Sequence, residues 1–118
     1  MKIMKLPTFL RKTILATTLL MTSSLSLADG WSPKLTVADL NIGGNGLHGT
    51  LVELNGYAFS GCSSSAAAFL DGANNPNYKE ILSALLAAKI ANQQVRVNTT
   101  GCGGNNNKFS VIVEIIIP

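Results

Sequence analysis

Apolar and polar residues alternate over residues 34 to 42, which is the period of a β-strand with one buried face. The alternation slips by one residue around Ala38-Asp39, and such a slip is typical of a strand with a bulge. The apolar positions are Leu35, Val37, Leu40 and Ile42. We therefore expect a first, bulged strand here.

Two further strands are expected before residue 62. Gly43-Gly44-Asn45-Gly46 ends the first strand, and alternation resumes over residues 47 to 54. Asn55-Gly56 follows directly and is a strong signal for a hairpin turn. The turn predicts a third strand over residues 57 to 61, so that the three strands form a meander.

One helix is expected after an irregular connection. Residues 63 to 74 lack a clear period and end in turn-forming residues, and Phe69 and Leu70 are expected to pack against the core. Asn75-Pro76 is a favourable helix start, with Asn as the cap and Pro at the first helical position. Asn92 can adopt the left-handed conformation that ends a helix. The residues that recur at helical spacing between them are Tyr78, Ile81, Leu82, Leu85 and Ala88.

The C-terminal part of the chain predicts two more strands. Residues 94 to 99 alternate, and a loop rich in Gly and Asn follows at residues 101 to 107. Residues 109 to 117 are apolar on both faces apart from Ser110 and Glu114. We therefore expect this strand to be covered on both sides, by the helix on one and by another strand layer or another subunit on the other.

The expected order is β-β-β-α-β-β, which makes the chain mainly β with one helix. This is the element order of the OB-fold, a five-stranded Greek-key barrel with its helix between the third and fourth strands. A disulfide between Cys62 and Cys102, the only two cysteines, would join the end of the third strand to the far end of the fourth. A redox or metal-binding cysteine pair is the alternative.

The N-terminal 28 residues have the layout of a secretory signal peptide. A positively charged start is followed by an uncharged apolar run of about 12 residues and by Ser26-Leu27-Ala28, with small residues where a cleavage site needs them. The run is shorter than the roughly 20 residues of a membrane span. We expect a secreted or periplasmic product in which residues 29 to 118 form one domain, with no membrane span after cleavage.

Cleavage would change the charge of the protein. The whole chain has nine basic and six acidic residues. The signal contains four of the basic residues and none of the acidic ones, which leaves five basic against six acidic, a net charge of −1. The pI of about 9.1 therefore belongs largely to the signal. Because binding to nucleic acid needs clustered Lys and Arg, we expect no nucleic-acid partner.

The sequence offers little for catalysis or for metal binding. His48 is the only histidine, and the acidic residues show no spacing that suggests a catalytic pair. The serines lack a nucleophile motif, and the Gly-rich stretch at residues 43 to 46 is not a phosphate-binding loop. We expect a protein that is not an enzyme and that needs no cofactor or metal.

Polar loop residues and two aromatic residues are the candidate ligand-binding groups. Hydroxyl and amide side chains together with an aromatic face are the groups that bind sugars. The candidates are Trp31, Tyr57, Ser63, Ser64, Asn105 and Asn106. The alternative interpretation is that the polar residues form ordinary solvated turns and that Trp31 covers one end of the barrel.

Most of the expected mature chain, residues 29 to 118, resembles small exported bacterial proteins related to the B subunit of subtilase cytotoxin. The resemblance lies in the helix at residues 77 to 89, the strand Gln94-Val95-Arg96-Val97 and the closing Gly101-Cys102. It implies a pentamer that binds glycans. The glycan-contacting residues of that group have no one-by-one match here.

The expected function is a non-catalytic binding module for a glycan or protein receptor, with a homo-oligomer such as a pentamer as a further expectation. The alternative is a small envelope or secreted accessory or inhibitor protein that acts through protein–protein contacts.

Overall fold

The computed structural model describes residues 30–43 and 48–118. The predicted signal peptide and most of the Gly-rich turn, residues 44 to 46, lie outside the described residues, as does Leu47 at the expected start of the second strand. Within the described ranges, the chain forms six strands, one α-helix and one short 3-10 turn. In chain order these are β1 (Gly30–Trp31), β2 (Leu35–Ile42), β3 (Gly49–Leu54), β4 (Ala68–Asp71), α2 (Tyr78–Ala91), β5 (Gln94–Gly103), η3 (Asn105–Asn107) and β6 (Phe109–Ile116).

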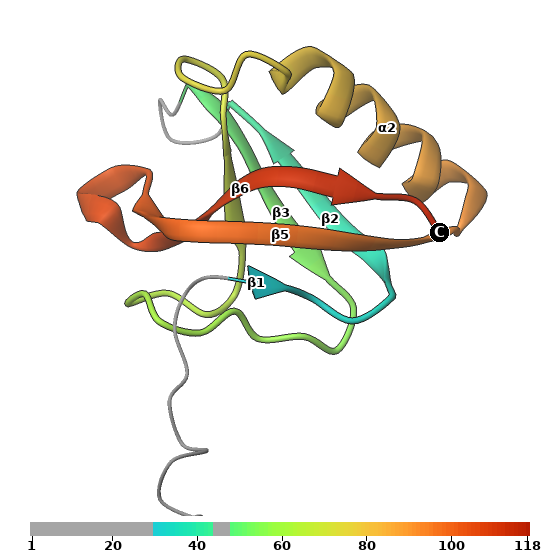
Figure 1. The fold of residues 1–118 in the computed structure, drawn as a ribbon, viewed down its shortest axis with the longest axis horizontal. Helices are drawn as coiled ribbons and strands as arrows, with labels where there is room; N and C mark the ends of the chain where they lie inside the picture. Colours follow the sequence, from blue (N-terminus) through green and yellow to red (C-terminus); the bar gives the residue numbers. More distant parts are fainter. Residues whose placement is uncertain (1–29, 44–47) are drawn as a thin grey trace, which may run out of the picture.

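The strand pairings close into a ring. β5 pairs with β2, β2 with β3, β3 with β4, β4 with β6, and β6 again with β5. Only the pair of β4 and β6 is parallel, and β1 adds to β5 outside the ring. Figure 1 shows α2 along one side of these strands and β1 at the opposite side. The prediction of a mainly β chain with one helix is confirmed.

The first two predicted strands are confirmed as an antiparallel pair. Val37 of β2 pairs with Leu54 of β3, and the next partners are Asp39 and Glu53, so Ala38 is the extra residue of the expected bulge. β3 places Thr50, Val52 and Leu54 in the interior, as strand alternation requires.

The prediction of a third strand over residues 57 to 61 is wrong, because these residues form an irregular loop. Gly56 makes a turn with a φ of 70°, but Asn55 stays bonded to β2, with its backbone N–H on the Thr36 carbonyl and its side chain on the Thr36 hydroxyl. The third strand is instead β4, which pairs with β3 and lies in the connection expected to be irregular. Phe69 and Leu70 are buried there as predicted.

The helix is confirmed over most of its length and begins later than predicted. α2 starts at Tyr78, and Asn77 is the cap position without a side-chain bond. Asn75 uses its side-chain oxygen to accept a hydrogen bond from the Asn77 N–H at 2.9 Å, before the helix begins. Asn92 has the left-handed conformation expected at the C-terminal end, with a φ of 53°.

The last two strands pair along most of their length, and β5 continues to Gly103 through part of the expected loop. β6 is buried on one face, at Ser110 and Ile112. The described chain does not cover the other face, because Val113 and Ile116 are about 40% exposed, as is Ile117 just after the strand. Coverage of this face by another strand layer of the described chain is therefore wrong, and coverage by another subunit stays a prediction.

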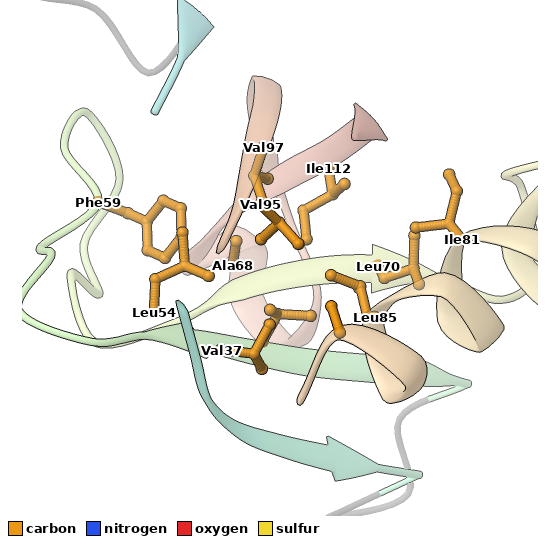
Figure 2. Close-up of a cluster of buried hydrophobic side chains, with 12 residues drawn as sticks. Val37, Leu54, Phe59, Ala68, Leu70, Ile81, Leu85, Val95, Val97 and Ile112 are labelled. Atoms are coloured by element: carbon orange, nitrogen blue, oxygen red, sulfur yellow. The ribbon is translucent and has the colours of Figure 1, made fainter. Parts of the chain in front are cut away.

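The core lies inside the ring, beneath α2 (Figure 2). Leu85 and Ile81 of the helix belong to one buried cluster with residues of all five ring strands, and Leu70, Val95 and Ile112 are among its fully buried members. Burying each such side chain stabilises the fold by roughly 1.5–3 kcal/mol. The hydroxyls of Tyr78 and Thr50, 2.9 Å apart, join the helix to β3.

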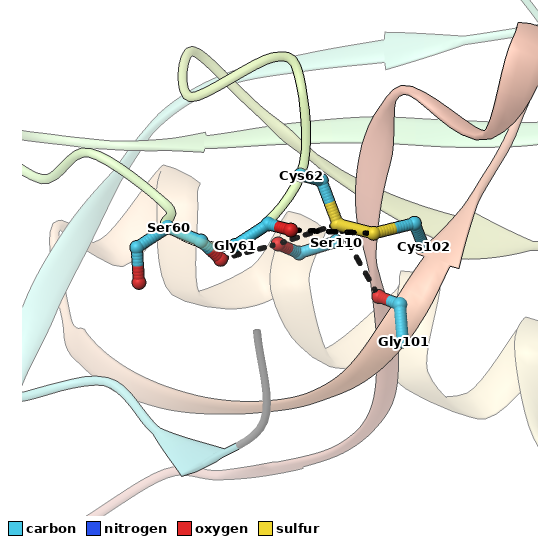
Figure 3. Close-up of a disulfide and its surroundings, with 6 residues drawn as sticks. All are labelled: Ser60, Gly61, Cys62, Gly101, Cys102 and Ser110. Atoms are coloured by element: carbon cyan, nitrogen blue, oxygen red, sulfur yellow. Dashed lines mark hydrogen bonds between the residues drawn. A yellow bond between two sulfur atoms is a disulfide. The ribbon is translucent and has the colours of Figure 1, made fainter. Parts of the chain in front are cut away.

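The disulfide between Cys62 and Cys102 is confirmed (Figure 3). It connects the loop before β4, rather than the end of a strand, to the far end of β5. The buried Ser110 hydroxyl lies 3.8 Å from the Cys62 sulfur and 3.5 Å from the carbonyl oxygen of Ser60. The bond therefore anchors a loop without secondary structure to the β5–β6 pair.

Candidate functional site

Trp31 lies on β1, and its neighbour Ser32 fixes β1 against β5. The Ser32 N–H donates to the Val97 carbonyl at 2.8 Å, and the Val97 N–H donates to the Ser32 hydroxyl oxygen at 3.0 Å. Ser32 is only 2% exposed, whereas Trp31 is 37% exposed. A buried polar anchor thus holds a partly exposed aromatic ring at the surface.

Arg96 of β5 lies against the ring of Trp31. The guanidinium carbon is 5.4 Å from the ring centroid, within the range of a cation–π interaction. The Arg96 Nε also donates to the Ser32 carbonyl at 3.1 Å, which uses one of the five N–H donors of a guanidinium. These contacts orient the positive charge beside the indole.

A row of side chains crosses three strands next to Trp31. Trp31 pairs with Asn98 of β5, and Asn98 pairs with Glu114 of β6. The Asn98 side-chain amide donates to a Glu114 carboxylate oxygen at 3.0 Å, so these two side chains share a face. We call Trp31, Arg96, Asn98 and Glu114 the Trp31 surface.

The predicted serine and asparagine candidates lie together, apart from this surface. Asn105 and Asn106 are exposed in η3, and the Ser64 N–H donates to the Lys108 carbonyl at 2.8 Å just after that turn. Ser63 is exposed and Ser64 half-buried, both directly after the disulfide. These candidates adjoin Cys62 and Cys102 in sequence, and Cys102 follows Asn98 of the Trp31 surface by four residues, roughly 13 Å along a strand.

Tyr57 is half-buried and is less exposed than Trp31. Its ring meets Phe59 edge-on, with centroids 5.0 Å apart, and it packs against the buried core. Of the two aromatic candidates, Trp31 alone is placed as a surface platform.

Sequence reasoning missed Arg96, Asn98 and Glu114. The alternation of β5 contains the signal, because buried Val95, Val97 and Thr99 imply that Arg96 and Asn98 face the other way. The partners of these residues on β1 and β6 depend on register, which the sequence pattern does not specify.

Residues 30–43 and 48–118 lack two features that would indicate other functions. There is no cluster of three His, Cys, Asp or Glu side chains that could hold a metal ion in this part of the chain. The same residues include no helix that is long and apolar enough to cross a membrane.

Comparison with known proteins gives no match of significance. No protein-family model matches the chain, and neither a curated protein nor a solved structure does so. The resemblance to cytotoxin B subunits therefore stays a prediction.

Proposed function

We propose that the domain is an exported, non-catalytic module that binds a glycan on the Trp31 surface. The observation that carries the proposal is the placement of a 37% exposed indole beside a guanidinium and an amide–carboxylate pair. The apolar C–H face of a sugar ring packs on an aromatic ring, and its hydroxyls both donate and accept hydrogen bonds. Arg96 supplies donors, Glu114 supplies acceptors, and Asn98 supplies both.

The proposal includes an OB-type barrel as the scaffold. The ring β2-β3-β4-β6-β5, with one helix between β4 and β5 along the chain, supports this assignment. Sites that lie on paired strands are held more precisely than sites on loops. The Trp31 surface is such a site, since its four side chains come from three adjacent strands.

Export is part of the same proposal. A disulfide that links an exposed cysteine to a half-buried one is compatible with the secreted or periplasmic location that the N-terminal residues predict.

A second candidate function, contact with other proteins, is favoured by the exposed apolar residues. Ile116 and Ile117 at the end of β6, and Leu86 and Ile90 on α2, are exposed, with Ile90 at 86%. Such residues mark association surfaces when they form a contiguous patch. They suit either a homo-oligomer, including the expected pentamer, or an accessory or inhibitor protein that binds a protein partner. Light scattering on the exported product separates a monomer from an oligomer.

A glycan array tests the main proposal. The exported product of the full chain should be retained on a subset of glycans, and Trp31→Ala should weaken binding about tenfold or more, as for an aromatic anchor that contributes 1.4 kcal/mol or more. Trp31→Tyr should keep part of the affinity, because an aromatic face remains.

Ile42→Ala is the matched control, since it also removes an exposed apolar side chain and belongs to neither proposed surface. It should bind as the unmodified protein does. Equal loss of binding in the Trp31→Ala and Ile42→Ala variants, or no glycan retained at all, would refute the proposal.

A further inference from the structure

A small cleft lies between the β4–α2 connection and β6, apart from the Trp31 surface. Its volume is about 260 Å³. It is lined by Asp71, Asn74, Asn75, Pro76 and Asn77 on one side and by Val111, Ile112 and Val113 on the other. The first group is mostly polar and the second is apolar.

The strand geometry explains why the cleft forms at this place. The pairing of β4 with β6 ends at Phe69 and Val111, and β4 itself ends at Asp71. On its other edge, β6 pairs Ile112 with Thr99 and Glu114 with Asn98, so Val113 between them is the extra residue of a bulge. Bulges redirect side chains and are frequent beside binding sites. Val113, 41% exposed, follows the buried Ile112 and so faces away from the core, where it lines the cleft.

The polar side of the cleft is held in a fixed arrangement. One Asp71 carboxylate oxygen accepts bonds from the N–H groups of Ala73 and Asn74, and the other accepts from the Asn74 side chain at 2.8 Å. The Asn75 side-chain nitrogen donates to the Ile112 carbonyl at 3.3 Å and so joins the connection to β6 across the cleft. These bonds restrict the rim before any ligand arrives, which lowers the entropic cost of binding.

The charge of the cleft restricts its ligand. Asp71 is the one ionisable residue among the eight that line it. Burial raises the pKa of this carboxyl, but the bonds from Asn74 and Ala73, with His48 nearby, outweigh that effect and lower the pKa below 3.8. The site is therefore negative at neutral pH, and it disfavours an anionic ligand.

We infer that this cleft binds a single uncharged sugar ring, as a second site of the domain. Two neighbouring hydroxyls of a pyranose can donate to the Asp71 carboxylate, which has lone pairs beyond the bonds that it already accepts. The ring's C–H face packs on Val111 and Val113. A volume of about 260 Å³ lies just below the roughly 300 Å³ at which sites for drug-sized molecules begin, which suits one ring rather than an oligosaccharide.

The inference rests on the proposed function only in taking a sugar as the ligand. The Trp31 surface and the cleft have no residue in common. A failure of the proposed function can therefore be distinguished from a failure of the inference about the cleft, because the backbone amides of each site can be followed separately.

The test is a titration followed by two-dimensional ¹H–¹⁵N NMR of the exported product. The probes are methyl β-galactopyranoside, methyl α-mannopyranoside and methyl β-N-acetylglucosaminide, with N-acetylneuraminic acid as the anionic probe. At least one neutral glycoside should shift the amides of Asn74 and Asn77, which line the cleft and are distant in sequence from the Trp31 surface, in a saturable way. Trp31→Ala should leave these shifts unchanged, even if glycan binding at the Trp31 surface is lost.

Asp71→Asn should weaken the neutral probe about tenfold, because bonds to a charged acceptor are the stronger ones. Asp39→Asn removes the same charge at an exposed position of β2 and should have no effect. The inference is overturned if no neutral glycoside shifts the cleft amides, or if N-acetylneuraminic acid binds there as well as they do. Propylamine, a cation without hydroxyls, would also overturn it by shifting the same amides more strongly than the glycosides.

Discussion

Replacing both cysteines by serine, Cys62→Ser with Cys102→Ser, removes the covalent link between the loop before β4 and the end of β5. The bond closes a segment with a sequence separation of 40, which contains β4, α2 and most of β5. Loop-closure entropy for that length gives a loss of about 4 kcal/mol on removal of the bond. Little packing is lost with it, because Cys102 is exposed and Cys62 is half-buried.

The size of this loss matters for so small a domain. The free energy of unfolding of such domains is about 5–15 kcal/mol, so a loss of this size should leave the fold only marginally stable. The serine pair should keep the native strand pairing, since the bond acts mainly by restricting the unfolded chain.

Urea unfolding followed by far-ultraviolet circular dichroism measures the loss. The serine pair should unfold at a clearly lower urea concentration, and the reduced unmodified protein should show the same shift. A loss below about 1 kcal/mol would refute the entropy reasoning. An altered amide exchange pattern along β5 and β6 in the folded variant would show instead that the bond is needed to shape the native state.

Four other outcomes are expected. Leu85→Ala should cost about 2–5 kcal/mol in urea unfolding, because Leu85 is fully buried, whereas Leu86→Ala, at 37% exposed, should cost far less. Tyr78→Phe should cost about 1–2 kcal/mol by the same measurement, since it leaves a buried threonine hydroxyl of β3 without its partner. The fold lowers the pKa of the Asp71 carboxyl below 3.8. The ionised carboxylate therefore stabilises the fold above that pH, and this stabilisation is lost as the pH falls through the lowered pKa. Asp71→Asn should flatten the pH dependence of the melting temperature below about pH 4. The intact mass of the exported product should equal that of residues 29 to 118 with one disulfide; a product that keeps its first 28 residues would contradict the predicted cleavage.

The elements with a clear hydrophobic period could be predicted from the sequence, but the strands with which they pair could not. The slip at Ala38 and the stripe of α2 follow from local patterns that the fold retains. The error at residues 57 to 61 came from Asn55-Gly56, which forms a turn but no hairpin because Asn55 remains bonded to β2. β4 was missed because its first residue, Ala68, is a weak strand former that follows two other alanines.

The candidate sites show the same division. Trp31 could be chosen from the sequence, since an aromatic residue is a recognisable sugar platform. Its neighbours Arg96 and Glu114 depend on the register of three strands, and the cleft lies where the pairing of β4 with β6 ends. Nothing in the local pattern of either strand indicates that they pair.

The most direct test of the central claim uses the fact that Trp31 is the only tryptophan in the chain. Its fluorescence therefore reports on the proposed glycan surface alone. When the exported protein is titrated with a glycan retained on the array, we expect a saturable change in Trp31 emission, with the same midpoint as binding measured by calorimetry. Calorimetric binding of that glycan without any change in Trp31 emission would contradict the assignment of the site.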